Sequence, residues 1–128
     1  MSGEAPSEEA CAWQQGRCHC GAVRFEFVLA SHKGVSCNCS YCVRKAALHH
    51  RVPAGNFRLL MGAEQLSSYR FGTMRARHFF CRTCGIHTHC HPRSAPEEVN
   101  VNLHCVDALQ DVHIELSLHD GRGWAAVP

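Results

Sequence analysis

The sequence predicts one small, mostly β domain made of short strands. Apolar and polar side chains alternate over several short stretches, and a period of two is typical of half-buried strands. Glycines such as Gly62 and Gly72 separate some of these stretches. At 128 residues the chain has the usual length of a single domain. Strands this short enclose only a small core, so a further source of stability is expected.

The clearest strand is centred on Phe25, because Val23, Phe25 and Phe27 alternate with Arg24 and Glu26. A turn is expected at residues 31–34, followed by a lead into a group of cysteines. The remaining elements are a short helix at 40–48 with Ser40 as its N-cap, and strands at 57–61, 66–71, 77–80, 86–90, 99–103 and 112–118.

The chain divides into a loose N-terminal lead, residues 1–15, and a single folded unit, residues 16–128. The lead is polar and acidic and lacks the apolar stretch of a secretory signal. No apolar run approaches the roughly 20 residues that span a bilayer. The net charge of +2 is too small to indicate nucleic-acid binding. We therefore expect a cytoplasmic protein with no membrane or nucleic-acid partner.

Seven of the ten cysteines fall into three tight clusters. In a chain without an export signal, such clusters are typical of metal ligands and not of disulfides. Four thiolates around a tetrahedral metal make a closed structural site, whereas three leave one position open for water or substrate. Seven thiols therefore suit one closed and one open site. The clusters are Cys18-x-Cys20, Cys37-x-Cys39-x-x-Cys42 and Cys81-x-x-Cys84.

Spacing alone allows the first cluster to share a metal with either the middle or the last cluster. Cys20 and Cys84 are each followed by a glycine, Gly21 and Gly85, whereas Cys42 is not. Glycine suits the tight turn in which backbone N–H groups point at sulfur. This feature favours pairing the first and last clusters, with the middle cluster as a separate triple.

Three segments together resemble the glutathione-dependent formaldehyde-activating enzyme family, which includes centromere protein V. They are residues 18–25 (CHCGAVRF), residues 37–42 with their three cysteines, and residues 79–85 (FFCRTCG). Residues 91–94 and 103–107 are most similar to the centromere protein V branch. The resemblance covers about residues 16–110 and implies a β-tent fold of small antiparallel sheets around zinc.

The resemblance also implies roles for the cysteines. Cys18, Cys20, Cys81 and Cys84 would hold a structural zinc, and Cys37, Cys39 and Cys42 would hold a second, open and catalytic zinc. The implied reaction joins formaldehyde to the glutathione sulfur as S-hydroxymethylglutathione, by a carbon–sulfur lyase running in reverse. A small-molecule thiol is thus the expected partner.

The chemistry of an open three-thiolate site agrees with that implication. A free thiol titrates near 8.5, and coordination to zinc deprotonates it. Glutathione could therefore enter the open position as a thiolate, beside an aldehyde. Its two carboxylates need cations. Arg44 and Lys45 directly follow Cys42 and are the candidate contacts, with Arg75, Arg77 and Arg93 as further candidates.

Four other residues invite a functional interpretation. His87, His89 and His91 alternate on one expected strand and so would share a face. One of them could close the open metal site, but an exposed polar strand face is the favoured interpretation. Cys105 could line the pocket, although a small core residue is favoured for a lone cysteine between apolar neighbours.

Two functions compete with a thiol-binding enzyme. One is a non-enzymatic, zinc-stabilised interaction module, as in the centromere protein V branch, although the acidic lead does not provide a basic tail for it. The other is a metal or redox sensor, since an open group of thiolates binds soft metals and oxidises easily.

Overall fold

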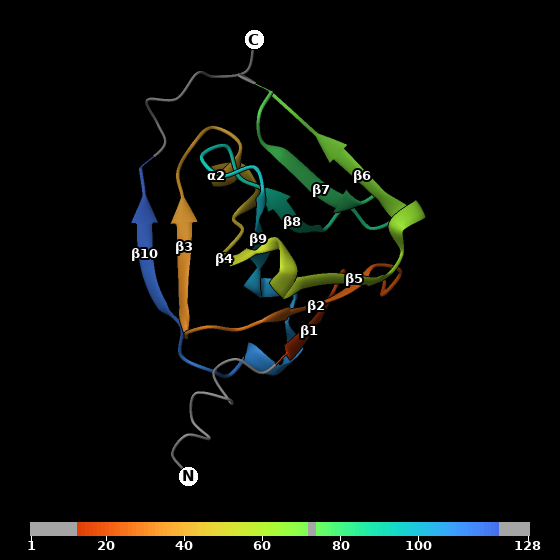
Figure 1. Ribbon diagram of the computed structural model, residues 1–128, viewed down its shortest axis with the longest axis horizontal. Helices are drawn as coiled ribbons and strands as arrows, with labels where there is room; N and C mark the ends of the chain where they lie inside the picture. The colour runs from red at the N-terminus through yellow and green to blue at the C-terminus, as the bar shows by residue number, and fades with distance from the viewer. Residues whose placement is uncertain (1–12, 72–73, 121–128) are drawn as a thin grey trace.

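A computed structural model describes residues 13–71 and 74–120, which form two sheets and very little helix. The three-stranded sheet has the order β1-β2-β5, and the seven-stranded sheet has the order β10-β3-β4-β9-β8-β7-β6. Figure 1 shows β10 and β3 at one side of the molecule and β6 and β7 at the other. The strands are β1 (Trp13–Arg17), β2 (Arg24–Val28), β3 (Lys33–Cys37), β4 (His49–Pro53), β5 (Phe57–Met61), β6 (Leu66–Tyr69), β7 (Arg77–Cys81), β8 (His87–His91), β9 (Glu98–Asn102) and β10 (Glu115–His119).

Nearly all strand pairs are antiparallel, with the β10–β3 pair as the parallel exception among the described strands. Between the strands, the described residues form one short helix, α2 (Cys42–Lys45), and four 3-10 turns at Ala54–Asn56, Ala63–Gln65, Leu103–Cys105 and Asp107–Leu109. The prediction of a mostly β, β-tent fold is confirmed. No helix in residues 13–71 or 74–120 is long and apolar enough to cross a membrane.

The main core lies where β2 faces β4 and β9. Phe25 and Phe27 are fully buried, as the alternation in β2 predicts, and they pack with Val52 and Val101. Arg24, between the predicted core positions, is exposed. Each buried phenylalanine contributes roughly 2–3 kcal/mol of transfer free energy, so β2 anchors the smaller sheet on the larger one.

Three strands were not expected from the sequence: β1, β4, and β3, whose residues were predicted as a turn and a lead into the cysteines. β1 begins at Trp13, so residues 13–15 belong to the sheet and not to the loose lead, while residues 1–12 lie outside the described part of the chain. β4 is a polar stretch, yet His49 and His50 are buried through its pairing with β9. Neither β1 nor β4 has the apolar alternation of a recognisable strand, so only the pairing with β2 and β9 identifies them.

The helix is much shorter than predicted. α2 spans Cys42–Lys45 and not residues 40–48, and Tyr41 precedes it without a capping side chain, so Ser40 is not the N-cap. The helix stops because Ala46 adopts the left-handed conformation, with φ of 54°. The expected turn at 31–34 is also shortened, since β3 already begins at Lys33.

Candidate metal centres

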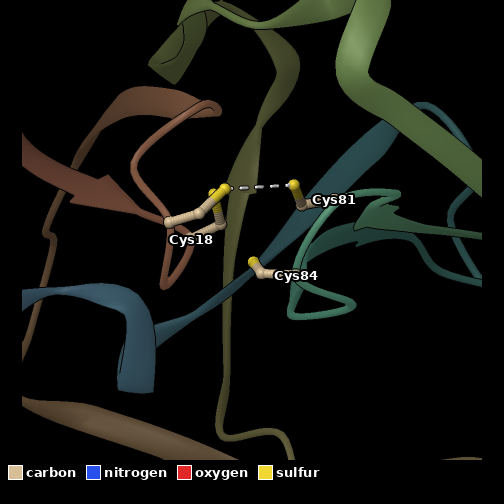
Figure 2. A group of neighbouring side chains, drawn as sticks. Cys18, Cys81 and Cys84 are labelled. Atoms are coloured by element: carbon tan, nitrogen blue, oxygen red, sulfur yellow. Dashed lines mark hydrogen bonds between the residues drawn. The ribbon is translucent and has the colours of Figure 1, made fainter.

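The first and last cysteine clusters meet, as the glycine argument favoured. One sulfur from each of Cys18, Cys20, Cys81 and Cys84 lies within 4.8 Å of the other three. Cys20 Sγ is 3.7 Å from both Cys18 Sγ and Cys81 Sγ. A tetrahedron with metal–sulfur bonds of about 2.3 Å has edges of about 3.8 Å, whereas a disulfide joins sulfurs at about 2.05 Å. The quartet therefore fits a tetrahedral metal ion, and Figure 2 shows its labelled side chains converging.

Each half of the quartet is a tight turn between two strands. One lies between β1 and β2, and the other between β7 and β8. Gly21 and Gly85 both adopt left-handed backbone, with φ of 82° and 81°, a conformation that costs glycine little. The two turns belong to different sheets, so a metal bound here would link the sheets.

Backbone N–H groups point at the quartet sulfurs. Val23 N donates to Cys18 Sγ at 3.3 Å, and Thr83 N donates to Cys81 Sγ at 3.4 Å. Desolvation raises the pKa of Cys84, but hydrogen bonds from backbone N–H groups and neighbouring thiols outweigh it and lower this pKa to about 6. Such donors favour the thiolate form that metals bind.

The middle cluster forms a separate group of three thiols. Cys37 ends β3 and Cys42 begins α2, and the sulfurs of Cys37, Cys39 and Cys42 lie within 4.8 Å of one another. Cys39 N donates to Cys37 Sγ at 3.5 Å, and Cys42 N donates to Cys39 Sγ at 3.3 Å. A hydrogen bond from the Cys42 thiol lowers the pKa of Cys37 to about 5. This triple also fits a metal ion.

A cavity of about 300 Å³ opens at the triple. All three cysteines line it, whereas none of the quartet cysteines is among the described residues that do. Its walls are largely apolar and include Phe71 and Pro92, and two cations, Arg51 and Arg93, also line it. The Arg51 guanidinium is oriented by Asn100 Oδ1 at 3.2 Å. The cavity thus combines thiols, apolar walls and cations, as a site for a charged organic thiol would.

Arg44 and Lys45 lie elsewhere. Arg44 is exposed and donates to the Ser40 carbonyl oxygen at 2.6 Å. Lys45 Nζ is 3.0 Å from His78 Nδ1 and lies over the Tyr41 ring, 4.4 Å from its centroid. Neither residue lines the cavity at the triple. The contact of Arg44 and Lys45 with glutathione stays a prediction. Arg93, one of the further candidates, lines the cavity and is better placed to bind a ligand there.

The alternating histidines do not form an exposed strand face, so that prediction is wrong. His87 and His89 are 7% and 5% exposed. The pairing of β7 with β8 shifts by one residue, because Phe79 faces His89 but Phe80 faces His87. This bulge reverses the alternation. His89 stacks on Phe79 at 4.7 Å between ring centroids, whereas His87 lies on the other side, toward Lys45. None of the three histidines belongs to the ligand group at the triple.

Cys105 is part of the main core, as favoured, and is 5% exposed. Burial raises its pKa to about 12. It also borders a second cavity of about 650 Å³, beyond α2.

The residues that the sequence analysis missed are His49, Arg51 and Cys90, all of which line the first cavity. His49 and Arg51 lie on β4, a strand that the sequence did not predict. Cys90 lies outside the three cysteine clusters of the sequence, so spacing gave no signal for it.

The comparisons with known proteins agree with this arrangement. Residues 13–119 match the glutathione-dependent formaldehyde-activating enzyme family, so the chain belongs to that family. The chain is also similar to a Rhodobacter sphaeroides protein of known crystal structure. The two sequences are 38% identical, the structures superpose with a TM-score of 0.74, and the match covers 81% of this chain and all of that one.

Proposed function

We propose that the protein is a zinc-dependent enzyme of the carbon–sulfur lyase type, which forms S-hydroxymethylglutathione from glutathione and formaldehyde. The observation that carries the proposal is the cavity of about 300 Å³ lined by Cys37, Cys39 and Cys42. Three thiolates leave one position of a tetrahedral metal open, and here that position has room for a ligand. Membership of a family described by glutathione-dependent formaldehyde activation supports the same reaction.

The two cysteine groups would have different roles, one structural and one catalytic. Cys18, Cys20, Cys81 and Cys84 would hold a structural zinc between the sheets, and the triple would hold the second zinc at the cavity. Zinc bound by the triple would supply a Lewis acid that lowers the pKa of a thiol in the site.

The reaction needs little beyond binding and orientation. A bond forms between the glutathione sulfur and the aldehyde carbon, the thiol proton ends on the former carbonyl oxygen, and nothing is oxidised or reduced. Arg51 and Arg93 would hold the glutathione carboxylates, because both cations line the cavity. Asn100 and Ser94 hold the Arg51 guanidinium, each at 3.2 Å, so this cation is oriented before the ligand arrives.

The test must separate catalysis from the uncatalysed addition, since thiols and aldehydes also combine in water. Exchange between formaldehyde and S-hydroxymethylglutathione at equilibrium can be followed by NMR, with and without protein. We expect the wild-type protein to raise the exchange rate at least about tenfold and Cys42→Ser to return it to the protein-free rate. Cys105→Ala, which changes a buried cysteine of the core, is the matched control. Equal rates for wild type and Cys42→Ser would remove the triple from the reaction.

A further inference from the structure

A third group of metal-binding side chains lies beside the cysteine triple. His49, His87 and Cys90 each offer one ligand atom within 4.8 Å of the others. They are 4%, 7% and 2% exposed, so the group is buried more completely than the quartet. His49 begins β4 and the other two lie on β8, and these strands flank β9. The bulge in β8 lets His87 and Cys90, three residues apart, contribute to one group.

Both imidazoles carry a buried nitrogen that lacks a hydrogen-bond partner. These atoms are Nδ1 of His49 and Nε2 of His87. A buried polar atom without a partner costs about 1–3 kcal/mol, and two of them in one cluster with a thiol are unusual. A third such atom, His78 Nε2, lies outside the group. A metal ion bound through the nitrogens of His49 and His87 would satisfy both of them at once.

The opposite nitrogen of His49 connects this group with the triple. His49 Nε2 is 3.5 Å from Cys42 Sγ. When the triple holds a metal, Cys42 is a thiolate, so Nε2–H of His49 donates to it and the lone pair of the imidazole is on Nδ1, the unpartnered atom. Histidines that bind metals characteristically donate their other N–H to an anionic group. The contact with Cys42 therefore prepares His49 to bind a metal through Nδ1.

The surroundings of His87 are compatible with the same role. Lys45 Nζ is 3.5 Å from His87 Nδ1 but only 3.0 Å from His78 Nδ1. The ammonium of Lys45 has three N–H groups and can donate to both rings, and donation to Nδ1 of His87 places the ring proton on Nε2. Metal binding through Nε2 therefore requires the longer contact, at 3.5 Å, to open while Lys45 stays on His78. The rings of His49 and His87 are nearly perpendicular, at 80°, with centroids 6.2 Å apart, so the two imidazoles do not stack and can converge on an ion.

We propose that His49, His87 and Cys90 form a third metal site, next to the triple and independent of the function proposed for it. Two neutral imidazoles and one thiolate suit a divalent ion of the zinc or cobalt(II) class. Such a site carries a formal charge of +1, opposite to the −1 of a divalent ion in three thiolates. His49 and Cys90 both line the cavity of about 300 Å³, so a fourth ligand can approach from there. The ligand atoms already lie within 4.8 Å of one another, and a tetrahedral ion with two nitrogen ligands and one sulfur ligand places them about 3.5 Å apart.

The test is the cobalt(II) content of the full-length protein, prepared without metal, loaded anaerobically and freed of excess cobalt. We expect about three equivalents in the wild type and one fewer in Cys90→Ala and in His87→Ala. Cobalt is measured by mass spectrometry, and visible absorption shows whether the lost ion was tetrahedral. Cys105→Ala is the matched control, since Cys105 is also a buried cysteine outside the three clusters. It should keep all the cobalt of the wild type.

The outcomes separate this proposal from the proposed function. Cys37→Ser should lose the ion of the triple and keep the ion at Cys90. If Cys90→Ala and His87→Ala bind as much cobalt as the wild type, the third site does not exist, whatever happens at the triple. If neither variant folds, Cys37→Ser decides, because it should keep two equivalents, and a content of one equivalent, the ion of the quartet alone, would overturn the proposal.

Discussion

Lys45 Nζ lies 3.0 Å from His78 Nδ1, so the cation at the end of α2 contacts a buried imidazole that lines the cavity at the triple, although Lys45 itself does not line it. The His78 ring also lies 4.4 Å from the Tyr41 ring and stacks on Phe71 at 5.6 Å, between centroids. The contact thus joins α2 to β7 next to the rings of Tyr41 and Phe71. It also keeps the imidazole uncharged, since desolvation and then Lys45 lower the pKa of His78 to about 3.

This lowered pKa predicts a pH dependence of stability. The unfolded chain takes up a proton on His78 near pH 6.5, whereas the native protein does so only near pH 3. Stability from this residue is therefore complete above pH 6.5 and is lost as the pH falls toward 3. Between pH 8 and pH 6 the loss amounts to about 0.8 kcal/mol. Urea unfolding of metal-saturated protein at both pH values measures it.

His78→Phe is the informative variant, because phenylalanine keeps the ring contacts with Tyr41 and Phe71 but cannot be protonated. We expect the difference in free energy of unfolding between pH 8 and pH 6 to shrink by about 0.8 kcal/mol relative to the wild type. The metal ligands titrate alike in both proteins, so their contribution cancels in the comparison. An unchanged difference would mean that His78 is protonated in the native state at pH 6.

A second prediction concerns the cations at the cavity. Arg51→Gln should weaken glutathione binding about threefold to tenfold, because it removes an oriented cation that lines the cavity. Arg44→Gln is the matched control, since Arg44 is exposed and bonded to the Ser40 carbonyl oxygen. Saturable changes in the absorption of the cobalt(II) protein on adding glutathione give the dissociation constants. A larger effect for Arg44→Gln would restore the assignment made from its position after Cys42.

Much of the fold and of the cysteine grouping could be predicted because the signals are local. The alternation around Phe25 predicts β2 and its buried face, and the glycines after Cys20 and Cys84 predict which clusters meet. The features that escaped prediction depend on pairing between distant strands. His49 is buried because β4 pairs with β9, and the face of His87 depends on a bulge opposite β7. Neither the pairing of β4 with β9 nor the bulge opposite β7 can be recognised from the local sequence.

The two cysteine groups should differ in what their loss does to the fold. Cys84→Ser should abolish the cooperative thermal transition, because the quartet connects a turn of the three-stranded sheet with a turn of the seven-stranded sheet. Structural zinc sites contribute on the order of 10 kcal/mol to folding. Cys42→Ser removes a ligand within a short local segment and should lower Tm only slightly while losing one metal ion. Thermal unfolding followed by circular dichroism compares the two. Equal damage from both would end the division into a structural and an open site.

The last prediction concerns the contact between β5 and the first cysteine turn. Gly62 follows β5 with φ of 94°, and a Cβ atom there would lie 2.2 Å from the Ala22 carbonyl oxygen. Gly62→Ala therefore combines left-handed backbone with a clash against backbone that cannot move without displacing the Cys18–Val23 turn. We expect it to destabilise the protein by more than about 2 kcal/mol and to weaken metal binding by the quartet. Gly55→Ala is the matched control, because no atom lies within 4 Å of the added methyl group. If chemical denaturation finds the two variants equally stable, the turn is free to move and β5 does not position the quartet.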